Sequence, residues 1–378
     1  MDLSIVTTTG NVTVSADDND FALANGTGAI TDNLTGEAAN IIGNLATLDA
    51  ATGIGSGVAP ADIETRITTL DATNKGTTGD ININEIAAGG SINVNDLSQT
   101  NAVGSGSISL FTENGDMTVL AAQSGVTIAG SGSVTVDANT TLPGNEDTTP
   151  TGSVNINAVI TTAGGNITIN ADHDIIAGAA GTVSTGVAGG NITLTADTNN
   201  SVQNISADGR FDGTIQFAAG ANITAGTGNV TFSLPDCDGS ILSNIVSATN
   251  ITKENSGQLQ FGGAAATFNY SGQTIINDGI LSVIGTLTDS TPAVGGVSVD
   301  PDGTPGAILG GTGAINANVT VASGGIIDPG TFSTVDCSVL NTGILKVNGD
   351  VTFESGSTFR VQLNGLVLGT QYDQLAVV

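Results

Sequence analysis

The chain has 378 residues, of which 54 are Gly, 35 are Asp or Glu and only 6 are Lys or Arg, so its formal net charge is -29 at pH 7. Such a surface repels phosphate backbones and anionic lipid, so we expect no nucleic-acid partner and no membrane insertion in this segment. The six cations are too scattered to form a basic stripe: Arg66, Lys75, Arg210, Lys253, Lys346 and Arg360. Because hydrophobic residues make up 39% of the chain, we expect it to fold.

A five-residue phrase recurs along the chain, consisting of Gly, a small polar residue, an aliphatic residue, Thr or Asn, and a second apolar residue. It occupies residues 10–14, 79–83, 90–94, 115–119, 132–136, 152–156, 165–169, 190–194, 228–232 and 349–353. In each phrase the two apolar side chains face one side of a strand, and Thr or Asn faces the other. The leading Gly permits a positive φ or a tight corner. The phrases therefore predict short, half-buried strands that are joined by corners.

The repetition also favours one fold class over others. Short alternating strands occur in β-sandwiches as well, but these phrases are near copies of one another, and aromatic residues are only 3% of the chain. In stacked coils, residues of the same kind lie above one another on successive coils, so small aliphatic side chains can fill a narrow interior. We therefore predict an all-β chain that forms a right-handed parallel β-helix, or β-solenoid, as a single elongated stack with variable corner loops.

One segment departs from the strand pattern. Within residues 37–49, Ile41, Ile42, Leu45 and Leu48 have helical spacing, and residues 62–66 could start a further turn. We interpret both stretches as irregular coils or a short decorating helix.

The two cysteines, Cys237 and Cys337, are far apart in the chain. In a solenoid with roughly 20 to 25 residues per coil and about 4.8 Å between coils, they would lie about 20 Å apart, which is beyond the reach of a disulfide. No second Cys or His lies near either one, so neither matches a zinc-binding pattern. We expect two free side chains.

The composition changes near residues 234–239, where Gly-Asn-Ile-Thr phrases give way to longer Gly-Gly loops, and five of the eight Pro residues lie from Pro235 onward. We place a boundary there, with one repeat region at residues 1–235 and a second at residues 236–378 that continues the same stack. The N-terminus lacks the basic head and apolar stretch of a secretion signal, and residues 371–378 stop within a predicted strand. We interpret the chain as a fragment of a longer protein.

Two stretches resemble known repeat families. Residues 53–119 carry Gly-Ile-Gly-Ser-Gly at 53–57, Ile-Glu-Thr-Arg-Ile at 63–67, and the phrases at 79–83 and 115–119. They resemble the repeats of giant filamentous haemagglutinin-like bacterial surface proteins. Residues 257–375, with Ala-Ile-Leu-Gly-Gly-Thr-Gly at 307–313, Asp-Pro-Gly at 328–330 and Tyr-Asp-Gln-Leu at 372–375, resemble the autotransporter-associated β-strand repeat. The resemblance implies a parallel β-helix of a bacterial adhesin, and it brings no catalytic motif.

A few acidic residues and one histidine are candidates for chemistry. His173 lies between Asp172 and Asp174, but the sequence offers no nucleophile elbow for it, and we interpret it as a corner histidine. Asp172 with Asp197 or Asp137 could stack as the carboxylate pair of a glycoside hydrolase, although solvated corner acids are the simpler interpretation. Asp300 with Asp302, and Asp236 with Asp238, lack the other ligands of a calcium loop. We therefore predict no catalytic, cofactor-binding or metal-ligating residue and no cofactor, with diffuse binding of Ca²⁺ or other counterions.

These observations favour a non-enzymatic, adhesin-like structural stalk at the bacterial cell surface or outside the cell, with the export signal outside this segment. Its long polar faces would bind a host or neighbouring cell surface, glycans or extracellular matrix. Copies of the chain could also associate with one another end to end. Two alternatives remain: a self-assembling surface sheath or filament subunit, and a β-helix enzyme that degrades polysaccharides.

Overall fold

The computed structural model describes residues 1–16, 27–55, 61–87, 90–138, 152–198, 213–235, 239–241, 244–263, 267–289, 295–333 and 340–378. In this part of the chain every regular element is a β-strand, and the residues form two compact units, Met1–Asn191 and Ile192–Val378. Parallel strands stack in long sheets, which confirms the predicted all-β class and the parallel β-helix. The right-handed winding and the single continuous stack stay predictions. Among the described residues no helix has the length and apolar character needed to span a membrane.

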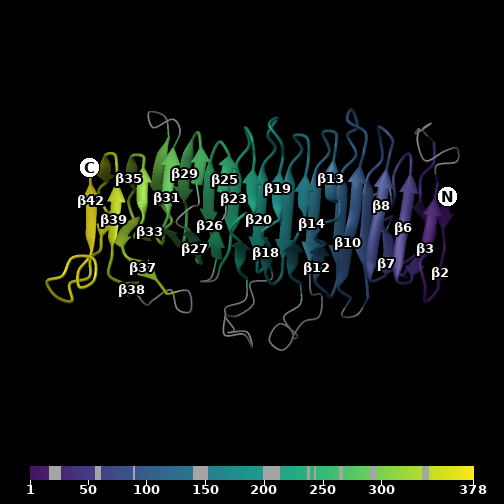
Figure 1. Ribbon diagram of the computed structural model, residues 1–378, viewed down its shortest axis with the longest axis horizontal. Coiled ribbons are helices and arrows are strands. Elements are labelled where there is room, and N and C mark those ends of the chain that lie inside the picture. The colour runs from purple at the N-terminus through teal and green to yellow at the C-terminus, as the bar shows by residue number, and fades with distance from the viewer. Residues whose placement is uncertain are drawn as a thin grey trace. The chain divides into compact units, whose positions relative to one another are not determined.

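In the first unit the strands form parallel sheets, and each coil contributes one strand to each sheet. One sheet contains β2 (Val6–Thr7), β5 (Ile41–Ile42), β7 (Ile63–Arg66), β9 (Ile81–Glu85), β11 (Ile108–Thr112), β14 (Val134–Ala138) and β17 (Ile167–Ala171). Beside it run β3 (Val12–Ser15), β6 (Leu45–Ala50), β8 (Thr69–Asn74) and β10 (Ile92–Gln99), and Figure 1 shows β3, β6 and β8 side by side. A short pair, β1 (Asp2–Leu3) with β4 (Thr31–Asp32), lies apart from these sheets.

After β10 the long strands divide in two. β10 pairs through its first half with β12 (Met117–Val119) and through its second half with β13 (Gly125–Ile128). Two narrower columns follow from this point: β15 (Val154–Ile156) and β18 (Ile175–Ala177) continue from β12, while β16 (Val159–Thr161) and β19 (Thr182–Ser184) continue from β13. From here each coil of the first unit carries three strands.

The second unit repeats this arrangement with three parallel columns. The first contains β20 (Ile192–Ala196), β23 (Val230–Ser233), β26 (Ile251–Glu254), β29 (Gln273–Ile276), β32 (Gly296–Val299), β35 (Val319–Val321) and β40 (Val351–Phe353). The second contains β21 (Ile215–Phe217), β24 (Gly239–Ile241), β27 (Gln258–Phe261), β30 (Ile280–Val283), β33 (Ile308–Gly311), β36 (Ile326–Pro329) and β41 (Thr358–Phe359). The third contains β22 (Asn222–Thr224), β25 (Asn244–Ser247), β28 (Thr267–Tyr270), β31 (Thr286–Asp289), β34 (Ala314–Asn316), β39 (Ile344–Val347) and β42 (Gln374–Val377).

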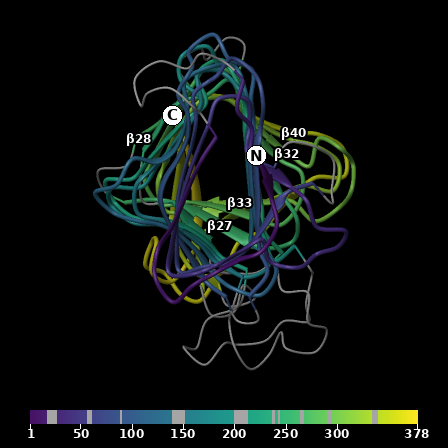
Figure 2. The same cartoon turned by 90° about the vertical axis from the view of Figure 1, so that its right-hand side faces the viewer.

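Within this unit the columns form distinct walls. Figure 2 shows β27 and β33 in one wall and β32 and β40 in another. An antiparallel hairpin, β37 (Thr331–Phe332) with β38 (Leu340–Asn341), leaves the stack between β36 and β39.

The interior is built by like residues in register. Ile81, Ile108, Val134 and Ile167 are Cα partners on successive coils of the first unit, and all are buried. Every predicted phrase forms a strand, and nearly all alternate between buried and half-buried residues, as in Ile-Thr-Ile-Asn-Ala of β17. Aromatic packing enters in the second unit, where the rings of Phe261 and Phe268 stack with their centroids 4.6 Å apart.

The segment with helical spacing is instead two strands, β5 and β6, and residues 63–66 form β7, so the expectation of irregular coils or a short helix was wrong. In β6 the buried residues are Ala46, Leu48 and Ala50, which follow the period of two. Backbone bonding to β3 and β8 on the adjacent coils outweighs local helix propensity here.

Three sequence predictions are not tested by the structure. Cys237 and Cys337 lie outside the described residues, as do Asp236 and Asp238. The predicted boundary between residues 235 and 236 concerns the type of repeat, and it stays a prediction.

Candidate functional site

In several phrases the leading Gly is required by close packing between coils. Of the phrase glycines, only Gly79 and Gly152 have a positive φ, at 91° and 99°. A Cβ on Gly132, Gly165 or Gly190 would overlap the carbonyl oxygen of the equivalent glycine one coil earlier. A positive φ, one of the two reasons that the sequence suggested for this Gly, therefore applies to only two of the copies, and the tight corner stays a prediction.

The small polar residue that follows this Gly bonds the coils to one another. Asp80 Oδ1 accepts the backbone N–H of Ser107 at 2.8 Å, and the Ser107 hydroxyl accepts that of Ser133 at 3.1 Å. The ladder continues through Asn166, which donates its N–H to Ser133 and accepts that of Asn191 at 2.9 Å. A shorter ladder in the second unit runs from Asn229 through Asn250 to Gln273. The corner residues thus satisfy backbone donors that no strand pairing reaches.

Two amides form a buried polar network in the first unit. Asn74 and Gln99 are Cα partners on adjacent coils, and they are 0% and 4% exposed. Asn74 Oδ1 accepts the N–H of Gly53 at 3.0 Å, and its Nδ2 donates to Gln99 Oε1 at 2.7 Å. Gln99 Nε2 in turn donates to the carbonyl oxygens of Gly79 and Ser107. The network fixes the corner against two neighbouring coils.

Glu85 is an acid inside the same unit and is 0% exposed. Its carboxylate accepts hydrogen bonds from Thr65 Oγ1 at 2.9 Å and from the N–H groups of Ile67 and Ala87. Burial nevertheless raises the pKa of Glu85 to about 7, because desolvation outweighs these bonds.

This raised pKa predicts a pH-dependent stability. The folded chain binds more protons than the unfolded chain between pH 4.5 and about 7, so Glu85 makes unfolding easier as the pH rises through that window, by up to about 3 kcal/mol. We expect Glu85→Gln to flatten this part of the profile, measured by chemical denaturation from pH 5 to pH 8. The exposed Glu354→Gln is the matched control, and an unchanged slope in Glu85→Gln would contradict the assignment.

The imidazole ring of His173 contacts both a serine and an acid. Its Nδ1 lies 2.8 Å from Asp174 Oδ2 and 3.3 Å from Ser153 Oγ. A catalytic triad needs the serine on one ring nitrogen and the acid on the other, whereas both groups here approach Nδ1. The arrangement holds a corner in place, with the Asp174 N–H donating to Ser153 at 3.4 Å.

The acids proposed as a stacked pair are distributed over both units. Asp137 on β14 accepts a hydrogen bond from Asn170 Nδ2 at 3.2 Å, and burial together with the charge of Asp172 raises the pKa of Asp137. Asp172 follows β17 on the next coil and is 6% exposed. Asp197 belongs to the second unit, and within the first unit Asp172 lies close enough for its charge to act on Asp137.

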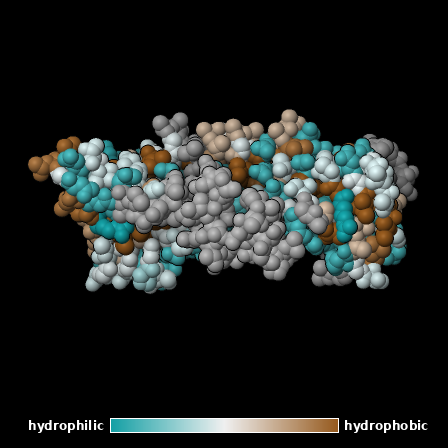
Figure 3. Space-filling model, turned by 90° about the horizontal axis from the view of Figure 1, so that it is seen from below, coloured by the Kyte–Doolittle hydropathy of each residue, from teal (hydrophilic) through white to brown (hydrophobic). Residues whose placement is uncertain are grey.

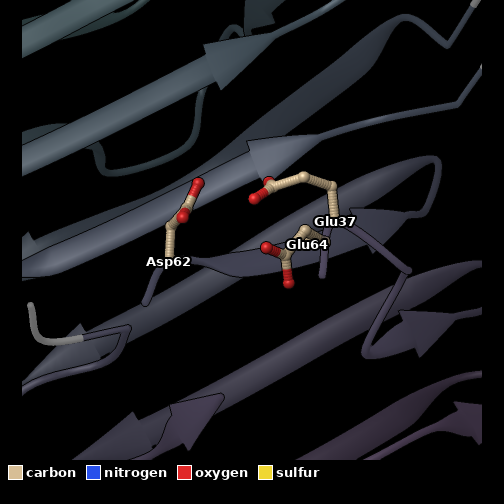
Figure 4. A group of neighbouring side chains, drawn as sticks. All are labelled: Glu37, Asp62 and Glu64. Carbon is tan, nitrogen blue, oxygen red and sulfur yellow. The ribbon is translucent and has the colours of Figure 1, made fainter. Parts of the chain in front are cut away.

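Three other acids converge at the first unit. One carboxylate oxygen from each of Glu37, Asp62 and Glu64 lies within 4.8 Å of the other two, and Figure 4 shows the three groups together. Glu37 comes from the loop between β4 and β5, Asp62 directly precedes β7, and Glu64 lies on β7. Sequence reasoning missed this cluster. The available signal was that Asp62 and Glu64 are two residues apart, which places them on one face of a strand.

The second unit exposes apolar side chains near the C-terminus. Leu363, Leu366 and Val367 are 75%, 95% and 54% exposed, and Figure 3 shows hydrophobic residues at the end where Figure 1 places the C-terminal strands.

Comparison with known proteins gives one informative similarity. A stretch of 120 residues, or 32% of the chain, is 34% identical to the adhesin BmaC autotransporter of Brucella suis biovar 1 (strain 1330). The match spans 3% of that protein's length. No family model and no solved structure matches the chain. Part of the chain is thus similar to an autotransporter adhesin.

Proposed function

We propose that the chain is a non-enzymatic, adhesin-like structural segment of a bacterial surface protein, in which the stacked coils give stiffness and present extended polar faces for binding. The observation that carries the proposal is the register of outward-facing residues. Asn82, Ser109, Thr135 and Thr168 are Cα partners on successive coils of one sheet. Such a row offers repeated hydrogen-bonding groups at the spacing between strands, about 4.8 Å, which suits a partner with many weak contacts.

The partial similarity to an autotransporter adhesin supports the same function and a place at the cell surface. The polar coat supports it as well, because Thr, Asn and Ser can bind glycans or matrix proteins through hydrogen bonds without a deep pocket. We place the partner among host or neighbouring cell surfaces, glycans and extracellular matrix.

Adhesion of coated beads tests the proposal. We expect beads that carry the full chain to adhere to cultured epithelial cells, or to fibronectin or collagen, above albumin-coated beads. The double variant Thr135→Arg/Thr168→Arg changes one outward row, and Thr127→Arg/Thr161→Arg changes a row on another sheet of the same unit. We expect at least one of them to lose adhesion while its circular dichroism spectrum is unchanged.

The same preparation separates the alternatives. Adhesion no better than that of albumin would contradict the proposal. Concentration-dependent fibres in sedimentation and electron microscopy would favour a filament subunit. Glycan cleavage that disappears in Asp172→Ala would favour an enzyme.

A further inference from the structure

The buried acid Glu64 is the most unusual member of the carboxylate cluster. It is 0% exposed, and neither of its carboxylate oxygens accepts a hydrogen bond from another residue in the part of the chain that the structure describes. Oδ1 of Asp62 is likewise buried, with no hydrogen-bond partner among the described residues. A buried carboxylate without a partner is costly, so these oxygens need either a proton or a cation.

The charged groups around Glu64 add to its need for a proton or a cation. Among the described residues, the charged side chains that act on Glu64 are Asp32, Asp62 and Glu37, and all three are acids. Asp32 is already engaged, since its Oδ1 accepts hydrogen bonds from the Leu34 N–H at 2.8 Å and from Asn40 Nδ2 at 2.5 Å. None of the described side chains that act on Glu64 is therefore a cation.

The strand that carries Glu64 is held in place from both sides. β7 pairs with β5 and with β9, where Glu64 is the Cα partner of Asn84. Asn40 is also fully buried and accepts the Glu64 N–H through Oδ1 at 3.0 Å. The backbone that carries the carboxylate is thus fixed by the fold.

The three acids differ in how deeply they are buried in the first unit. Glu37 is exposed, Asp62 is half-buried and Glu64 is buried. The mutual limit of 4.8 Å between oxygens fits ligands around one ion, because Ca²⁺–oxygen distances are about 2.3–2.6 Å. Carboxylates alone suit a hard cation, and the exposed side leaves room for water to complete the six to eight ligands of Ca²⁺.

We propose that Glu37, Asp62 and Glu64 bind one Ca²⁺ ion, which ties the loop between β4 and β5 to β7. The proposal does not depend on the adhesive function. It adds a specific site to the diffuse counterion binding expected from the net charge.

Calorimetric titration of the metal-free full chain with CaCl₂ at constant ionic strength tests the site. We expect a saturable event with one ion per chain, and a rise in melting temperature of a few degrees on saturation. Glu64→Gln and Glu37→Gln should each weaken this event by about tenfold or more. Glu354→Gln removes the same charge from an exposed position of the second unit and should leave it unchanged.

The stability of the metal-free variants gives a second readout. Glu64→Gln removes a buried charge, so without Ca²⁺ it should melt no lower than the wild type, whereas with Ca²⁺ the wild type should melt higher. Glu37 is exposed, so its substitution tests the site in a chain whose core is unaltered. Equal Ca²⁺ responses in wild type, Glu37→Gln, Glu64→Gln and Glu354→Gln would show diffuse binding only and would overturn the proposal.

Discussion

Gly165→Ala is expected to destabilise the first unit by about 3 kcal/mol or more, because the new Cβ would overlap the backbone of the coil before it. Its nearest atoms would be the carbonyl oxygen and carbon of Gly132, which a side-chain rotation cannot move. The coils would have to separate locally, and that would break the ladder in which Ser133 Oγ accepts the Asn166 N–H at 3.2 Å. Equilibrium denaturation with urea, followed by circular dichroism, measures the loss.

Gly10→Ala is a matched control from the same phrase. Residues 10–14 read Gly-Asn-Val-Thr-Val and residues 165–169 read Gly-Asn-Ile-Thr-Ile. A Cβ on Gly10 would meet only the Thr8 hydroxyl oxygen, at an ordinary 3.7 Å, so the substitution should change stability by about 0.5 kcal/mol or less. If both variants lost the same stability, the coil-to-coil explanation of the phrase glycines would be wrong.

Asn74→Ala is expected to have an effect of similar size through lost hydrogen bonds. The substitution leaves the Gly53 N–H and Gln99 Oε1 without their partner in a buried region. An unsatisfied buried group costs about 1–3 kcal/mol, so the loss should be about 3 kcal/mol. Denaturation measures the total, and hydrogen exchange at the Gly53 amide should become faster.

An outward-facing asparagine distinguishes this effect from a general cost of losing Asn. Asn155 lies in the middle of β15 on the outward side, and Asn155→Ala should stay within about 0.5 kcal/mol of the wild type. Asn74→Ala with wild-type stability and unchanged Gly53 exchange would show that the network contributes little to the fold.

The strands were predictable because their signal is local. Alternation in a phrase such as residues 165–169 decides which side chains are buried whichever coil lies next to it, and β17 has that pattern. Residues 41–48 show the opposite case. Their spacing suggested a helix, but β5 and β6 form because adjacent coils offer parallel backbone partners.

By itself the sequence determined the all-β class, the coil-forming phrases and the net charge of -29, since these follow from residue type and short-range order. Only the tertiary structure decided which distant residues meet. Glu37 reaches Asp62 and Glu64 because β5, which follows the loop of Glu37, pairs with β7 on the adjacent coil. Asn74 meets Gln99 because these two residues are partners in the pairing of β8 with β10. The buried face of each strand and the geometry of each corner loop together set that register, and a single phrase does not show which residues of another coil will lie beside it.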